Sequence, residues 1–322
     1  MNVLVFGSAN IDETYTVPHM VRRGETLSAT VVVRRSGGKG LNQAIAFARA
    51  GASTRFAGLV GEDGRFLLDE LASAGVDADL VEVLDDERTG VAVIQNDAAG
   101  DNCILLYGGA NQRVTPAYIG RVLLSAQPGD LIMLQNEVNV LDQIIERAAS
   151  AGLRIALNPS PMNENVPVHL LDKVDYLLVN EVEATQLIRV WDAWALAAGE
   201  VEEPAEQLDW DTLVAASDWD AIARALGQRF AHATVVLTLG GAGSLLIQDG
   251  KVAVRQAALS REVVDTTAAG DTFTGYLLYA LISGEDPALA MRRAAAASAI
   301  AVARPGAAPS IPVAREVDDA LA

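Results

Sequence analysis

The residues best suited to chemistry form one stretch, Asp265-Thr266-Thr267-Ala268-Ala269-Gly270-Asp271-Thr272-Phe273-Thr274-Gly275. Small residues at 268–270 let backbone N–H groups crowd together ahead of an apolar run, Phe273 to Ile282, that we expect to be helical. Such N–H groups and the positive end of a helix dipole bind anions. We therefore predict an anion hole at Ala268, Ala269 and Gly270, with Asp271 as general base for phosphoryl transfer. The alternative is that Asp271 only caps the helix.

A second glycine-rich stretch, Ser36-Gly37-Gly38-Lys39-Gly40-Leu41-Asn42-Gln43-Ala44, precedes a helix that we expect to end near Gly51. The glycines before Lys39 allow a ligand to approach the main chain closely. Asn42 lies three residues after Lys39 and would face the same side of the helix. The stretch lacks the spacing of a Walker A loop. The alternative is a flexible glycine turn with a solvated lysine.

Taken together, the two stretches resemble a known family. D-T-x-A-A-G-D-T-F-x-G and G-G-K-G-x-N-Q-A, more than 200 residues apart, are similar to the two signatures of the ribokinase-like sugar kinases, the PfkB family. S-A-N-I-D at 8–12 resembles the sugar-binding opening of that family. The resemblance extends from Val3 to about Pro312 and is interrupted once.

The resemblance implies an ATP-dependent sugar kinase that uses Mg²⁺ and is activated by K⁺. The motifs are most similar to those of members that convert D-ribose to D-ribose 5-phosphate. The implied sugar contacts are Asn10, Asp12, Gly38, Lys39, Asn42 and Glu137. Asn180 and Glu183 match an N-x-x-E motif that organises magnesium and phosphates, and Thr238 and Gly240 match a nucleotide-contacting T-L-G. The implied potassium site, largely of backbone oxygens, comprises Asp265, Thr267, Ala301, Arg304, Gly306 and Ser310.

Other functions stay open at this point. Within the family, the chain could be a nucleoside kinase or a 2-keto-3-deoxygluconate kinase. It could also be a sugar-binding protein that has lost catalysis, although it retains Asp271. A nicotinamide-dependent oxidoreductase also fits an alternating α/β pattern, but the glycine fingerprint of such enzymes is missing after the first strand.

Several elements must position these residues. We expect strands at Val3–Phe6, Thr54–Ala57, Asp130–Leu134, Arg154–Leu157, Asp175–Val179 and Thr234–Thr238, separated by helices such as Leu141–Ala151. This alternation predicts an α/β protein with a doubly wound, mostly parallel sheet. The resemblance implies the three-layer fold of the ribokinase-like family. Polar residues follow several strands, which predicts a crevice along one edge of the sheet.

Two blocks break this alternation with a pattern of period two. Residues 13–35 and 90–107, the latter with a turn at 97–101, predict a small β-sheet lid over a core formed by residues 1–12, 36–89 and 108–322. A single small sheet leaves one apolar face exposed. By resemblance, such lids pair between subunits, so we predict a homodimer.

Residues 190–220 interrupt the resemblance and form a predicted insertion ahead of a helix at Ala221–Phe230. All four tryptophans lie in it, Trp191, Trp194, Trp210 and Trp219. It has no basic residue and nine acidic ones, Asp192, Glu200, Glu202, Glu203, Glu206, Asp209, Asp211, Asp218 and Asp220. Either the tryptophans pack on the domain, which we favour, or they form a partner-binding surface.

Composition limits the partners. The chain has 322 residues, 51% of them hydrophobic, which is enough for a large packed core. A net charge of −18 disfavours nucleic acid and anionic membranes as partners. The expected small-molecule partners, a sugar and ATP, are those that the family resemblance implies. The single cysteine, Cys103, excludes an intramolecular disulfide. We expect neither a secretory signal nor a membrane span, and predict a cytoplasmic protein.

Overall fold

The central sheet of the computed structural model has eight strands. The structure describes residues 2–97, 101–200 and 210–322. The order across the sheet is β14-β13-β12-β11-β10-β9-β1-β4, parallel from β4 to β12 and antiparallel at β13 and β14. The bounds are β1 Val3–Phe6, β4 Thr54–Ala57, β9 Leu131–Gln135, β10 Arg154–Asn158, β11 Tyr176–Asn180, β12 Thr234–Thr238, β13 Ser244–Gln248 and β14 Lys251–Gln256. The predicted fold class is confirmed.

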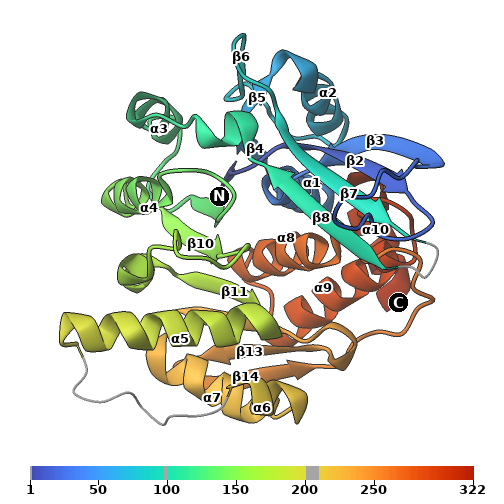
Figure 1. Ribbon diagram of the computed structural model, residues 1–322. Helices are drawn as coiled ribbons and strands as arrows, with labels where there is room; N and C mark the ends of the chain where they lie inside the picture. Colours follow the sequence, from blue (N-terminus) through green and yellow to red (C-terminus); the bar gives the residue numbers. More distant parts are fainter. Residues whose placement is uncertain (1, 98–100, 201–209) are drawn as a thin grey trace.

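Two helical layers cover the two faces of this sheet (Figure 1). Strand β1 shows the division, because Leu4 and Phe6 belong to one hydrophobic cluster and Val3 and Val5 to the other. The second cluster includes α1 Lys39–Ala50, α2 Phe66–Ser73, α8 Ala269–Ile282, α9 Pro287–Val302 and α10 Ala314–Leu321. The first includes α3 Pro116–Leu123, α4 Leu141–Ser150, α5 Glu181–Ala198 and α7 Trp219–Arg229. Each fully buried Leu or Phe stabilises this arrangement by about 1.5–3 kcal/mol.

Short 3₁₀ turns complete the helical part, at η1 Glu62–Gly64, η2 Gly109–Gln112, η3 Val168–Lys173, η4 Gly240–Ala242 and η5 Ala308–Ser310. None of the helices in the described ranges combines the length and apolar composition that a membrane crossing needs. Helix α9 begins with an Asp286 cap and Pro287 in its first turn, as expected from those residue types.

A second, four-stranded sheet lies apart from the central one, with β2 Asn10–Thr16, β3 Val31–Gly37, β7 Gly90–Asn96 and β8 Asn102–Tyr107 in the order β3-β2-β7-β8. Figure 1 shows these strands crossing one side of the molecule above α8 and α9. Residues 17–30 form no strand, although a period-two pattern predicts one there. Residues 98–100 of the predicted turn lie outside the described residues. A further pair, β5 Leu59–Gly61 and β6 Glu82–Leu84, forms a two-stranded sheet.

The segment predicted as an insertion begins inside α5, which continues to Ala198. Trp191, Trp194 and Trp219 pack against the first hydrophobic cluster, as the favoured interpretation expects. Helix α6, Trp210–Ala215, lies beside α5 and α7. The side chains of Trp210 and Asp211 are not described. Glu202, Glu203, Glu206 and Asp209 lie outside the described residues.

Helix α8 begins at Ala269, four residues before the predicted start. Its partner is α1, and the two approach closely at Gly275, where an added Cβ would lie 2.8 Å from the backbone nitrogen of Phe47. This contact brings the first turns of the two helices together, and those turns contain most of the predicted site.

Candidate active site

Asp271 lies in the first turn of α8, and the side chain is buried. Both carboxylate oxygens accept hydrogen bonds from amide side chains of α1. Asn42 Nδ2 donates to Oδ2 over 3.2 Å, and Gln43 Nε2 donates to Oδ1 over 2.9 Å. These bonds fix the direction of the carboxylate, and their donors are neutral, so it remains free to accept a proton.

The turn ahead of α8 has the geometry of an anion site. Ala268 adopts a left-handed conformation with φ 59°, which reverses the chain into the helix at a steric cost of about 1–2 kcal/mol. Ala269 N donates to Thr266 O over 3.2 Å. Within the described residues, the N–H groups of Gly270 and Asp271 have no partner, and an added Cβ on Gly270 would meet open space. An anion can therefore approach these two N–H groups directly.

A cavity of about 210 Å³, which we call the central cavity, lies against this turn. Its walls include Lys39, Asn158, Asn180, Glu183 and Asp271. Burial disfavours the charged form of Lys39, but the carboxylates of Asp271, Glu137 and Glu183 outweigh this effect and raise the pKa of its ammonium group. Lys39 is therefore a permanent cation inside a strongly acidic protein, beside the turn that would bind phosphate.

Asn180 and Glu183 form the start of α5. Asn180 Oδ1 accepts from Glu183 N over 2.8 Å, and Glu183 Oε2 accepts from Asn180 N over 3.0 Å, which is a capping box. Both residues also line the central cavity. Their oxygens suit a hard cation such as Mg²⁺. No group of three or more His, Cys, Asp or Glu side chains in the described ranges is arranged as a metal site, so water and phosphate oxygens would complete the ligand shell.

The glycines of the second motif are required by close contacts. Gly38 has φ 92°, and an added Cβ there would lie 2.9 Å from Asn10 N. At Gly40 the nearest backbone atom would be Ser8 N at 2.5 Å. At Gly37 a Cβ would lie 2.1 Å from the Asp12 carboxylate. The first turn of α1 is thereby pressed against the segment that joins β1 to β2.

Glu137 connects the segment that joins β1 to β2 with the start of α1. Its Oε2 accepts from the backbone nitrogen of Lys39 over 3.0 Å and from the hydroxyl of Ser8. Asn111 secures the neighbouring segment, since its Nδ2 donates to Asn10 Oδ1 over 2.7 Å and its Oδ1 accepts from Ala9 N over 3.1 Å.

The ionisation of Asp12 is strongly altered by its surroundings. Burial, followed by the negative charges of Glu137 and Asp271, raises the pKa of Asp12 from 3.8 to about 7. The three carboxylates therefore lie close enough to repel one another, and Asp12 changes charge near neutral pH.

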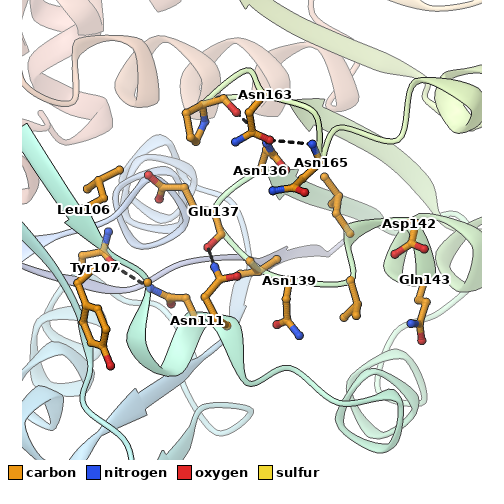
Figure 2. Close-up of a pocket in the computed structure, with 17 residues that line it drawn as sticks. Leu106, Tyr107, Asn111, Asn136, Glu137, Asn139, Asp142, Gln143, Asn163 and Asn165 are labelled. Carbon is orange, nitrogen blue, oxygen red and sulfur yellow. Dashed lines mark hydrogen bonds between the residues drawn. The ribbon is translucent and has the colours of Figure 1, made fainter. Parts of the chain in front are cut away.

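The predicted sugar contacts thus lie at the start of α1, at the start of β2 and just after the end of β9. A cavity of about 540 Å³ opens beside them, and Asn10 and Glu137 line it (Figure 2). Lys39 and Asp271 line the central cavity instead. Glu137 joins the two spaces through its bond to Lys39 N.

A third cavity, of about 490 Å³, lies on the other side of the α8 turn. Thr238, Thr266 and Gly270 line both this cavity and the central one, so the two cavities adjoin. Gly240, for which the family resemblance implies a nucleotide contact, also lines this cavity. Its other walls are largely apolar and include Leu259, Val263, Phe273, Ala299 and Val302, which suits the flat face of a base.

The residues predicted to bind a monovalent cation lie in two adjoining loops. Asp265 Oδ1 accepts from Thr267 N and Oγ1 over 2.9 and 2.6 Å, and Oδ2 accepts from Gly306 N over 2.9 Å. Burial alone would raise the pKa of Asp265, but these hydrogen bonds and the nearby charge of Arg35 lower it. The Arg304 guanidinium pairs with Glu316 at 2.5 Å, so only its backbone oxygen is available. Ser310 Oγ donates to Ala307 O, and Ala301 lies buried in α9.

Sequence reasoning missed four supporting side chains. Gln135 Nε2 donates to Gln43 Oε1 over 2.6 Å, which connects the end of β9 to Asp271 through Gln43. Asn111 holds Asn10, and Arg49 Nη1 donates to the carbonyls of Ala308 and Ile311 over 2.8 and 2.5 Å. The only signal in the sequence is that Gln43 directly follows Asn42 in the glycine-rich motif.

Comparisons with known proteins show which family the chain is similar to. A family model described as pfkB family carbohydrate kinase matches residues 1–314. The chain is 32% identical over 336 residues to a protein of Bacillus subtilis named ribokinase, covering 99% of each chain. It is similar to a solved structure of Arabidopsis thaliana ribokinase complexed with ribose and ATP, with a TM-score of 0.81, 30% identity, and 99% and 98% of the two chains covered. A ribokinase from Cryptococcus neoformans in complex with ADP gives a TM-score of 0.79 and 33% identity, with 99% of each chain covered.

Proposed function

This chain belongs to the pfkB family of carbohydrate kinases, and we propose that it transfers the γ-phosphoryl group of ATP to the 5-hydroxyl of D-ribose. The family and the kinase activity predicted from the two motifs are confirmed. The observation that supports the reaction most directly is the position of Asp271 beside two unpartnered N–H groups and the Lys39 ammonium. The relatives named ribokinase support ribose as the sugar.

The reaction needs three actions from the protein. Asp271 accepts the proton of the attacking hydroxyl, because its carboxylate is held rigidly by Asn42 and Gln43. The N–H groups at the start of α8 and the Lys39 ammonium bind the phosphoryl oxygens on which charge develops. Glu137 and Asn10 orient the sugar, and the third cavity holds the nucleotide, with Thr238 and Gly240 in its wall.

Magnesium fits this site. Bound there, Mg²⁺ would neutralise charge on the phosphates of ATP. Asn180 and Glu183 would hold it, most simply through water, because the capping box already occupies one oxygen of each side chain. ATP use also supports our assignment of the protein to the cytoplasm.

A monovalent cation fits the loops around Asp265. That carboxylate ties residues 265–267 to the loop at 304–310, and Arg49 anchors the far end of the loop. We propose that backbone oxygens of the predicted residues bind K⁺ and that the bound ion orders the turn preceding α8. The site would then support the N–H groups that receive the phosphoryl oxygens.

The small sheet supplies the proposed lid and dimer contact. Strand pairing places Val31, Ile104 and Leu106 on the face that contains Asp12. These apolar side chains are 52%, 53% and 50% exposed. We propose that this face closes over the sugar, which excludes water, and pairs with the same face of a second chain.

A coupled ATP assay with purified protein tests the proposal. D-Ribose should be phosphorylated in the presence of Mg²⁺, with D-ribose 5-phosphate as the product. The variant Asp271→Asn should lower kcat by roughly 10²–10⁴-fold and leave the KM for ribose nearly unchanged, because it removes only the base. Absence of ribose turnover by the wild-type protein would refute the proposed substrate, and near-normal kcat in the variant would remove Asp271 from the base role.

A further inference from the structure

The cavity beside the sugar contacts is larger than a five-carbon sugar needs. Its volume of about 540 Å³ lies in the range, roughly 300–1,000 Å³, that holds drug-sized ligands. Only two of the six predicted sugar contacts, Asn10 and Glu137, line it. We call the remaining part, beyond Glu137, the asparagine cavity, because its walls include Asn111, Asn136, Asn139, Asn163 and Asn165.

The charges around the asparagine cavity are of one sign. Among the described residues, Glu137 and Asp142 are the ionisable acids in its wall, and Tyr107 is the only other titratable side chain there. The described part of the wall contains no Lys, Arg or His. A carboxylate or phosphate placed in this space would face two like charges with no counter-ion, which disfavours its binding. The cavity therefore selects against anions.

Its amides are arranged to bind hydroxyl groups. Asn136 is buried, and its Nδ2 donates to Pro161 O over 2.7 Å and to Asn163 Oδ1 over 3.0 Å. Asn163 Oδ1 also accepts from Asn165 N over 2.9 Å. These bonds leave Asn136 Oδ1 as an acceptor and Asn163 Nδ2 as a donor, both without a partner in the described part of the chain. Figure 2 shows Asn136, Asn163 and Asn165 together, with Glu137 between them and Asn111.

We propose that the asparagine cavity is a subsite for an uncharged, hydroxyl-bearing extension of the sugar. The proposal rests on the proposed kinase reaction, because that reaction sets the direction of the sugar. The reacting 5-hydroxyl must lie at Asp271, in the central cavity, while the asparagine cavity lies across Glu137. The opposite end of the sugar, its anomeric carbon, therefore points toward the asparagines. Sugars that bear a hydroxymethyl group or a longer polyol chain at that carbon are the substrate class.

Two six-carbon probes separate polarity from charge. D-Psicose is ribose with a hydroxymethyl group in place of the anomeric hydrogen, and D-ribo-hex-2-ulosonate has a carboxylate in the same place. Psicose should be phosphorylated with a kcat/KM within about tenfold of that for ribose. The acid should be used about 100-fold less well than psicose, because its charge has no partner.

Two variants locate the effect in the asparagine cavity. Asn163→Leu removes the free donor and should lower the ratio of kcat/KM for psicose to that for ribose by about tenfold. Asn165→Lys is at an exposed position and places a cation in the wall, so it should raise kcat/KM for the acid by about tenfold. Gln228→Leu, on an exposed position of α7 far from the cavity wall, is the matched control and should leave all ratios unchanged.

The results distinguish this proposal from the kinase reaction itself. Ribose turnover without preferential use of psicose over the acid would overturn the subsite, as would an unchanged ratio in Asn163→Leu. If no sugar is phosphorylated, the kinase proposal fails, and calorimetric titration of the two six-carbon probes still decides the subsite. Binding of psicose that weakens about tenfold in Asn163→Leu would support it. Equal binding of psicose and the acid would refute it.

Discussion

Among single residues, the orientation of the Asp271 carboxylate depends on a chain of amide side chains that begins at the end of β9. Gln135 directly precedes Asn136 and Glu137 and donates to Gln43, which in turn donates to Asp271. Gln43 and Gln135 are both fully buried, and Gln135 Oε1 has no partner in the described residues. Burying an amide without a hydrogen-bond partner costs about 1–3 kcal/mol. The bonds that Gln43 makes to Gln135 and Asp271 therefore strongly favour one orientation of its side chain.

We predict that Gln43→Leu lowers kcat by about 10–100-fold, because the base is no longer held in one direction. The measurement is kcat for wild type, Gln43→Leu, Gln135→Leu and the double variant. The double variant should resemble Gln43→Leu, since both changes interrupt one chain. Additive losses in the double variant would contradict a positioning role.

The raised pKa of Asp12 predicts that both protein stability and the KM for ribose change with pH. Its pKa of about 7 means that the folded protein binds a proton that the unfolded chain releases near pH 4. Stability should therefore fall as pH rises from about 4 to 7 and level off above 7. The ionised carboxylate is the form that accepts hydrogen bonds from sugar hydroxyls, so the KM for ribose should rise by up to about tenfold per pH unit below 7.

These two effects can be measured on the same samples. Thermal unfolding and the KM values for ribose and ATP would be recorded from pH 5.5 to 8.5 in wild type and Asp12→Asn. The variant should lose both trends, while the KM for ATP serves as the internal control. A ribose KM that stays flat across pH 7 in wild type would show that Asp12 does not titrate against the sugar.

Single residues with local signatures can be predicted from the sequence, and long-range partners cannot. The small residues ahead of Asp271 and the glycines around Lys39 are local patterns, and they indicate an anion site and a close ligand approach from residue types alone. The bond between Gln43 and Asp271 joins residues 228 positions apart, and no spacing rule predicts such a contact. The raised pKa of Asp12 likewise depends on burial by the folded chain and then on the charges of Glu137 and Asp271, which are distant in the sequence.

At the scale of elements, the small sheet has two faces that can be tested against each other. Val31 and Ile104 lie on the face that contains Asp12, and Leu105 lies on the opposite face of β8. The double variant Val31→Asp with Ile104→Asp should weaken the dimer and raise the KM for ribose more than the KM for ATP, because like charges would meet across the closed lid. Sedimentation at micromolar concentration and initial rates provide the measurements.

Leu105→Asp is the matched control, since the side chain is 70% exposed on the same strand. It should leave the ribose KM unchanged. A monomeric wild type at micromolar concentration would remove the dimer and leave the lid to act within one chain. Equal effects of the two variants would show that the face containing Asp12 has no special role.

The loop at 304–310 should make the activity depend on which monovalent cation is present. Replacing Na⁺ by K⁺ at constant ionic strength should raise kcat, because the larger ion suits a site made of several backbone oxygens and would order the turn ahead of α8. Asp265→Asn should reduce this activation, since it weakens the bonds to Thr267 and Gly306. Equal rates in the two salts would count against the cation site.

Elements with a clear hydrophobic pattern are predicted to within a residue or two. The parallel strands β1, β4 and β12 match their predicted bounds. In β1 and β12 the reason is a continuous apolar run, which marks a buried parallel strand clearly. The antiparallel pair β13 and β14 is not predicted. Helix α8 starts four residues early because Ala268, in a left-handed conformation, reverses the chain where the sequence has no conventional cap.

At the scale of the whole molecule, the site depends on the meeting of two layers and two sheets. Helix α1 contains Lys39, Asn42 and Gln43 at one end and Arg49 at the other, so one rigid element contacts the sugar side, the base and the loop at 304–310. Because the net charge of the chain is −18, the positive charge of Lys39 is more important for binding phosphate. A phosphorylated substrate would approach an acidic surface and reach Lys39 only within the cavity.

The contact between α1 and α8 also sets the order in which the protein can mature during its synthesis. Helix α1 leaves the ribosome early, but its partners Gly275 and Asp271 follow some 228 residues later. At translation rates of about 5–20 residues per second, this interval lasts roughly 10–45 s. Throughout it, the apolar face of α1 lacks its native cover and Gln43 lacks its carboxylate. Nascent chains stalled before residue 269 should therefore bind chaperones, and those extended past residue 312 should release them.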